Sequence, residues 1–400
     1  MRLKRINDVC KRYRIDGKVR KLYTFSPRNV SYCSNHKVAS TYWIQVFRFL
    51  HNDTPPGVQR PIDISKYYTH QIPLRKTKKP NFHDKVNYEE TMQNYRFMVA
   101  RDPYQRLWSV YIDKFVLLDP YFWNNYFELI RANFLRDFGD AKKSLLRNER
   151  ANNSAPTLDF SSTSQFGKAA GLKHRPTFCK KQLSFEEFLH YIVATGESST
   201  SAMDDHFQPV HIGCNPCIFK PDFVAKVETM NLEKGFLLER LGLSPDIDGE
   251  ATYEDHVQRE ITTLSQFQFY LLINFGTPFS PCVTFKNLQE RIITAFVLNG
   301  YLPLGSFDII SPLLPMEKDK FIDKLMQLVR ISKRTAEDVH QQRENMRKEA
   351  YKKIPFQTLL SLQHIFKKDF LLFGYDSQPP YIYEDRIDFE IKKIFDNTHL

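Results

Sequence analysis

Two stretches of this chain place a buried strand directly before an amphipathic helix, and this pattern restricts the fold more than any other feature. They are "NVSYCSNHKVASTYWIQVFRFLH" (residues 29–51) and "YRFMVARDPYQRLWSVYIDKF" (residues 95–115). A third buried strand, "PDFVAKVETM" (residues 221–230), runs into a further helical segment. Strands that alternate with helices form parallel sheets whose faces the helices cover. The sequence therefore predicts an α/β fold with a mostly parallel central sheet flanked by helices.

The rest of the chain divides around this pattern. Helices are expected at 184–196, 254–275, 284–298, 317–349 and 356–371, so the C-terminal part is mainly helical. Residues 1–24 hold nine Lys/Arg against two Asp, and we expect a loosely held basic lead-in. One domain is expected over 25–376, with a surface excursion at 52–94, insertions near 137–181 and 245–345, and a tail at 377–400.

Charge and cysteine content limit the class of partner and the cellular compartment. The formal net charge of +11 favours an acidic partner such as a nucleotide, a nucleic acid, an anionic glycan or a membrane surface. No apolar run is long enough to predict a transmembrane helix, and the N-terminus lacks the apolar core of a signal peptide. Cys214 and Cys217 have C-x-x-C spacing without a second such pair, which favours disulfides over a zinc site.

The turn after the first strand has the parts of an anion site. Lys37 is followed by small residues, and Ser40 and Thr41 open the helix. A helix N-terminus offers unpaired N–H groups and the positive end of the helix dipole. The GxxxxGK[ST] pattern is absent, which disfavours ATP or GTP hydrolysis. The alternative interpretation is a capped helix with a lysine nearby.

The turn after the second strand suits a phosphate group. Arg101 stands at the end of the buried strand, where arginine is uncommon, and Ser109 follows two helical turns later. A guanidinium fork with a hydroxyl would bind phosphate oxygens. The alternative is an arginine paired with Asp102 or Asp113.

Taken together and in this order, the two motifs resemble the Golgi carbohydrate sulfotransferases. "YCSNHKVASTYW" is similar to their 5′-phosphosulfate loop and "VARDPYQRLWSVYIDKF" to their 3′-phosphate motif. "DDHFQPVHIGCNPCIFKPDFVAKVETM" and "IFKKDFLLFGY" resemble two further blocks of the branch that includes HNK-1, chondroitin, dermatan and N-acetylgalactosamine 4-O-sulfotransferases. The resemblance spans roughly residues 28–376. In the branch, proline usually stands at the place of His36 and tryptophan at the place of Phe207, and the segment 245–345 is usually shorter.

The resemblance implies a P-loop-like fold and a nucleotide donor, 3′-phosphoadenosine 5′-phosphosulfate, with no metal. By motif match, Lys37 contacts the bridging oxygen and the 5′-phosphate. The next four residues supply backbone N–H groups to the same phosphate: Val38, Ala39, Ser40 and Thr41. Arg101 and Ser109 hold the 3′-phosphate, and Arg106 is structural or lies behind the site.

The reaction also needs a base for the acceptor hydroxyl, and a histidine suits neutral pH. We expect His206, oriented by Asp204 or Asp205. The alternative is a His206 that is satisfied in a loop or binds glycan without moving protons. His36 is a weaker candidate, as are the carboxylates Glu89 and Glu90.

The resemblance thus predicts an enzyme, a sulfotransferase that moves a sulfuryl group to a sugar hydroxyl. The expected acceptor is the 4-position of N-acetylgalactosamine in chondroitin or dermatan, followed by glucuronic acid in an HNK-1-like epitope; no nucleic-acid partner is expected. The branch works in the Golgi lumen as membrane-anchored glycoproteins, and the anchor is missing from this sequence. The alternative is a catalytically silent protein that binds anionic glycan or nucleic acid through its basic surface.

Overall fold

The computed structural model describes residues 1–72, 85–137, 183–249, 252–275 and 283–383. Its centre is one four-stranded sheet in the order β1 (Leu22–Phe25), β2 (Val30–Cys33), β3 (Tyr95–Ala100), β4 (Phe223–Lys226). β2, β3 and β4 run parallel, while β1 pairs antiparallel with β2. The predicted α/β fold with a mostly parallel sheet is therefore confirmed.

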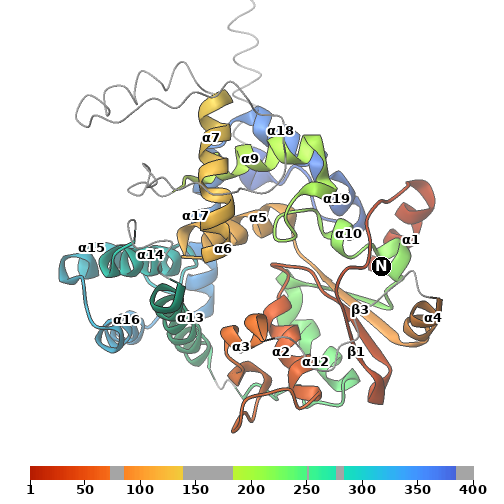
Figure 1. The fold of residues 1–400 in the computed structure, drawn as a ribbon, viewed down its shortest axis with the longest axis horizontal. Helices are drawn as coiled ribbons and strands as arrows, with labels where there is room; N and C mark the ends of the chain where they lie inside the picture. Colours follow the sequence, from red (N-terminus) through yellow and green to blue (C-terminus); the bar gives the residue numbers. More distant parts are fainter. Residues whose placement is uncertain (73–84, 138–182, 250–251, 276–282, 384–400) are drawn as a thin grey trace, which may run out of the picture.

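Helices surround the sheet on the lower right of Figure 1. They are α1 (Arg2–Arg12), α2 (Ser40–Leu50), α3 (Lys66–Gln71), α4 (Lys85–Gln93), α10 (Val210–Gly213), α11 (Pro216–Phe219) and α12 (Met230–Arg240). The sheet core joins Tyr32, Trp43, Phe47 and Phe97, whose rings are fully buried against one another. These aromatic side chains fix α2 on the sheet directly after the β2 turn.

A second, mainly helical core occupies the upper and left parts of Figure 1. Its helices are α5 (Pro103–Tyr111), α6 (Pro120–Phe122), α7 (Glu128–Asp137), α9 (Phe185–Ser198), α13 (Tyr253–Phe275), α14 (Phe285–Leu298), α15 (Ser306–Ile310), α16 (Lys318–Ser332), α17 (Ala336–Lys352), α18 (Phe356–Ile365) and α19 (Lys367–Phe373). α5 links the two cores because it leaves the end of β3 and packs Leu107 and Trp108 among the helices. In the described ranges, no helix combines the length and apolar character needed to cross a membrane.

Two helices expected from the sequence are each divided in the structure. The segment 317–349 forms α16 and α17, because Lys333 adopts a left-handed backbone (φ 45°) and Thr335 begins α17 with a capping box. The segment 356–371 divides at Phe366 into α18 and α19. The insertion expected near 137–181 lies almost entirely outside the described residues, as does the end of the tail.

The N-terminal residues are not loosely held, which corrects our expectation for residues 1–24. They form α1 and β1, and Val19 bridges to Cys214. A disulfide between Cys10 and Cys217 ties α1 to α11. The docking depends on partners some 200 residues away in the sequence, and local composition therefore gave no sign of it.

Candidate active site

The loop between β2 and α2 makes a tight turn. Lys37 and Ala39 both adopt left-handed conformations, with φ 64° and 60°. Non-glycine residues rarely take such angles, and they cluster at functional sites. Ala39 is the N-cap of α2 and has no side-chain oxygen to accept from the N–H groups of the first turn. Those N–H groups, from Ser40 and Thr41 onward, remain free of a capping side chain.

Lys37 is held by a carboxylate from the neighbouring strand–helix unit. Its Nζ lies 2.9 Å from Asp113 Oδ2. Burial lowers the pKa of Lys37 to about 8, although the Asp113 carboxylate raises it. Lys37 is therefore a cation at neutral pH, and its charge is sensitive to the loss of Asp113.

The end of β3 meets this loop through Arg101. Arg101 Nη1 donates to the carbonyl oxygen of Lys37 at 3.2 Å. The alternative pairing of Arg101 with Asp102 or Asp113 is wrong, because Asp102 caps α5 by accepting from Gln105 N–H and Asp113 binds Lys37. The buried Nε of Arg101 has no hydrogen-bond partner in the part of the chain that the structure describes.

Ser109 lies two turns along α5 and is half-buried. It makes no hydrogen bond to Arg101 among the described contacts. The two residues expected to share a phosphate are thus on one strand–helix unit without touching.

Arg106 joins the β2 loop to the segment that carries His206. It is 1 % exposed and donates to three backbone carbonyl oxygens, those of His36 (3.0 Å), Gln208 (2.5 Å) and Asp205 (3.3 Å). This agrees with the structural role expected for it.

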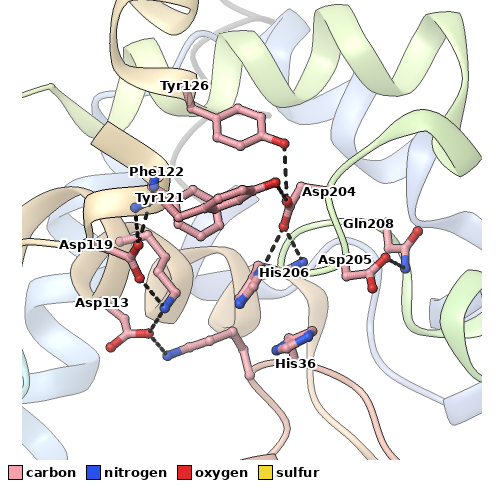
Figure 2. Close-up of polar contacts among 12 residues, drawn as sticks. His36, Asp113, Asp119, Tyr121, Phe122, Tyr126, Asp204, Asp205, His206 and Gln208 are labelled. Atoms are coloured by element: carbon pink, nitrogen blue, oxygen red, sulfur yellow. Dashed lines mark hydrogen bonds and ion pairs between the residues drawn. The ribbon is translucent and has the colours of Figure 1, made fainter. Parts of the chain in front are cut away.

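His206 is oriented by Asp204. Its Nδ1 and its backbone N–H both lie within hydrogen-bond distance of Asp204 Oδ1, at 2.7 and 2.9 Å (Figure 2). An Nδ1 that donates to the carboxylate leaves Nε2 as the basic nitrogen. Burial lowers the pKa of His206 below its usual value, although the bond to Asp204 raises it. Asp205, the other candidate, faces away and pairs with Arg20 and Lys21.

His36 stacks on His206, with ring centroids 3.9 Å apart. Its Nε2 lies 2.6 Å from Lys21 Nζ and must accept, because an ammonium group only donates. Burial and the neighbouring His206 and Lys21 hold the pKa of His36 well below its usual value. His36 is thus a neutral ring that stacks on His206 and directly precedes Lys37 in the chain.

Glu89 and Glu90 are poorly placed for catalysis. Both are exposed on α4, which immediately precedes the start of β3. Arg101 follows the opposite end of that strand, and six strand residues span roughly 20 Å. The structure therefore removes these carboxylates from the candidate base list.

Several charged residues of the site were not predicted. Lys114 bridges Asp113 (3.2 Å) and Asp119 (2.8 Å), and the first of these carboxylates binds Lys37 (Figure 2). Both Asp113 and Lys114 lie in a π-helical turn, Ile112–Val116, which redirects the chain after α5. The sequence signal was "IDKF" at the end of the second motif, where Asp113 had been considered only as a partner of Arg101.

His70 is the second missed residue, and it belongs to α3. Its Nε2 lies 3.0 Å from Thr41 Oγ1 at the start of α2. Burial lowers its pKa to about 4, which keeps the ring neutral. It lies in the 52–94 segment, which we had expected to be a surface excursion and which carried no motif.

Two disulfides hold the site's framework together. Cys33, the last residue of β2, pairs with Cys214, and Cys10 pairs with Cys217. The C-x-x-C cysteines therefore form disulfides, as expected. The segment from Asp204 to Cys217 is joined by one of them to the strand that leads into Lys37.

Comparison with known proteins finds a family model and several curated relatives. The family model described as "Sulfotransferase family" matches residues 20–267, which include every expected site residue. Human carbohydrate sulfotransferase 9 is 22% identical over 308 residues, covering 68% of this chain and 59% of that protein. Mouse carbohydrate sulfotransferase 12 is 25% identical (68% and 58%), and zebrafish carbohydrate sulfotransferase 14 is 23% identical (68% and 59%).

The match to these relatives spans less than two thirds of their own length. No solved structure matches this chain. The family model nevertheless covers more than half of the chain and includes both strand–helix units and β4. The chain belongs to the sulfotransferase family.

Proposed function

We propose that this chain is a carbohydrate O-sulfotransferase that uses 3′-phosphoadenosine 5′-phosphosulfate as donor. The observation that carries the proposal is the stacking of His206 on His36, the residue directly before Lys37, with ring centroids 3.9 Å apart. A cation suited to a leaving phosphate and a carboxylate-oriented base are thereby connected through one residue, His36. Sulfuryl transfer to a hydroxyl needs both groups.

The residues present fit such a donor. Lys37 and the backbone N–H groups of four residues at the start of α2 would hold the 5′-phosphosulfate: Val38, Ala39, Ser40 and Thr41. Arg101, whose buried Nε has no hydrogen-bond partner among the described residues, would bind the 3′-phosphate together with Ser109. Burial lowers the pKa of Arg101 to about 10, which still leaves the guanidinium charged at neutral pH.

The chemistry then follows from the positions of the side chains. His206 Nε2 takes the proton of the acceptor hydroxyl while that oxygen forms its bond to sulfur. The bond between sulfur and the bridging phosphate oxygen breaks, and Lys37 compensates the charge that builds on the leaving phosphate. Asp204 stabilises the imidazolium that forms, because its carboxylate already accepts from Nδ1.

The acceptor class is supported by the names of the relatives, which are carbohydrate sulfotransferases, and by the net charge of +11. A basic protein attracts anionic glycans. Within that class we propose the 4-hydroxyl of N-acetylgalactosamine in chondroitin- or dermatan-type chains. The two disulfides favour an oxidising compartment, which agrees with the proposed Golgi lumen.

The first test is the specificity of nucleotide binding. Calorimetry compares 3′-phosphoadenosine 5′-phosphate with adenosine 5′-phosphate in the wild type and in Arg101→Ala. We expect a strong preference for the 3′-phosphate that disappears in the variant. Equal weak binding of both nucleotides, unchanged by the mutation, would refute the sulfotransferase proposal and favour a silent polyanion-binding protein.

A further inference from the structure

A short aromatic helix beside His206 belongs to the same network as Lys37. α6 begins after Asp119, whose Oδ1 accepts from the N–H groups of Tyr121 (3.0 Å) and Phe122 (3.3 Å). The other oxygen of Asp119 binds Lys114, which also binds Asp113. α6 is therefore connected to Lys37 through Asp119, Lys114 and Asp113.

The rings of this segment pack around His206. Phe122 presents its edge to the His206 ring at 5.0 Å and stacks on Tyr126 at 5.3 Å. Phe122 is 1 % exposed, and Phe207, whose ring meets that of Tyr126 at 5.7 Å, is fully buried. Tyr121 differs from them because it is 52 % exposed.

The hydroxyl groups of Tyr121 and Tyr126 converge on one oxygen of Asp204. Tyr126 donates to Oδ2 at 3.1 Å and Tyr121 at 3.3 Å, while His206 uses Oδ1 (Figure 2). Tyr121 thus has an exposed ring whose outer end is fixed by a hydrogen bond. A rigid, half-exposed aromatic face next to the base is suited to packing against the apolar C–H face of a sugar ring.

We propose that Tyr121 binds the acceptor sugar by packing its ring on the pyranose, while its hydroxyl sets the orientation of the Asp204–His206 pair. The inference rests on the proposed function and adds the residue that positions the acceptor. Tyr121 then has two separable roles. The ring contributes acceptor affinity, and the hydroxyl adjusts the pKa of His206 through Asp204.

Two substitutions separate these roles. Tyr121→Ala removes the ring and the hydroxyl, whereas Tyr121→Phe removes the hydroxyl alone. We expect the alanine variant to raise the KM for unsulfated chondroitin by about tenfold, the scale of one aromatic contact. The phenylalanine variant keeps that KM. It moves the acidic limb of the kcat profile to higher pH, because Asp204 with one donor fewer stabilises the imidazolium more strongly.

Binding of 3′-phosphoadenosine 5′-phosphate, measured by calorimetry, reports the donor site and should be unchanged in both variants. The matched control is Tyr13→Ala, which removes another exposed tyrosine at the end of α1 and should not alter the KM for chondroitin. An unchanged chondroitin KM in Tyr121→Ala would overturn the inference while leaving the proposed function intact. A wild type that transfers no sulfate to chondroitin would overturn the proposed acceptor, and this inference with it.

Discussion

In the proposed site, the contact between Lys37 and Asp113 makes donor binding depend on pH, and replacing Asp113 should change that dependence. Burial lowers the pKa of Lys37 to about 8, and Asp113, at 2.9 Å, is the strongest influence that raises it. An opposite charge at this distance contributes about 1–3 pKa units. Asp113→Asn therefore lowers the pKa of Lys37, and the ammonium group loses its proton at a lower pH.

The size of the effect can be worked out from these values. With a pKa of about 8, roughly half of the Lys37 side chains are charged at pH 8. A decrease of about one unit leaves roughly a tenth charged at pH 8 but nearly all charged at pH 6. We expect Asp113→Asn to weaken binding of 3′-phosphoadenosine 5′-phosphate about fivefold at pH 8 and to leave it close to wild type at pH 6.

Calorimetry from pH 6 to 9 tests this expectation. The quantity to compare is the ratio of the affinities of the wild type and Asp113→Asn, because this ratio cancels the titration of the nucleotide itself. Lys37→Arg is the matched control, since a guanidinium stays charged throughout this range and the alkaline decrease should vanish. A ratio that is constant with pH, or an alkaline decrease that persists in Lys37→Arg, would refute the assignment of that limb to Lys37.

Three further predictions concern the base and the framework. Asp204→Asn should lower kcat about 10²-fold or more and move the acidic limb of the kcat profile to lower pH, because His206 loses the charge that raises its pKa; an acidic limb that stays in place would contradict it. Replacing Cys33 and Cys214 together by alanine should reduce the free energy of unfolding by about 2–4 kcal/mol in urea titrations under oxidising conditions. Because the variant lacks this disulfide, adding reductant should cause no further loss of stability from it. Arg106→Met should cost about 1.5–3 kcal/mol in the same measurement, since it leaves buried carbonyl groups unpaired; a stability equal to wild type would show that water replaces the guanidinium.

Local signals in the sequence located much of this fold. Hydrophobic period and capping residues predicted β2, β3, β4, α9, α13 and α14 at nearly their observed bounds, because strand burial and helix capping are set by neighbouring residues. Ser184 illustrates this, since the capping box it forms with Glu187 begins α9 at the predicted place. The parallel topology then brought Lys37 and Arg101 to one edge of the sheet, as expected for the carboxyl ends of neighbouring strands.

The parts that escaped prediction depend on distant partners or unusual turns. β1 is a short strand inside a basic segment, and only pairing with β2 identifies it. The π-helical turns at Ile112–Val116 and Trp123–Phe127 place Asp113 and Tyr126 in the site, and no residue pattern in one sequence specifies such turns. His70 reaches Thr41 from a segment without periodicity. Lys37, Arg101 and the Asp204–His206 pair were therefore named from the sequence, whereas most of the groups that adjust their charges were not.

Those adjusting groups determine the pH range in which the site has the charges that the proposed reaction needs. Lys37 must be charged and His206 neutral at the same pH, yet burial lowers the pKa of both. For His206 the decrease is favourable, because a lower pKa leaves more of the base unprotonated at a given pH. For Lys37 it is unfavourable, and Asp113 limits it to about 8. The two carboxylates have different surroundings. Asp113 binds the Lys37 ammonium group directly, whereas Asp204 accepts hydrogen bonds from two tyrosine hydroxyls as well as from His206. The tyrosine hydrogen bonds weaken the electrostatic stabilisation of the His206 imidazolium by Asp204. The pKa of His206 therefore stays below that of Lys37.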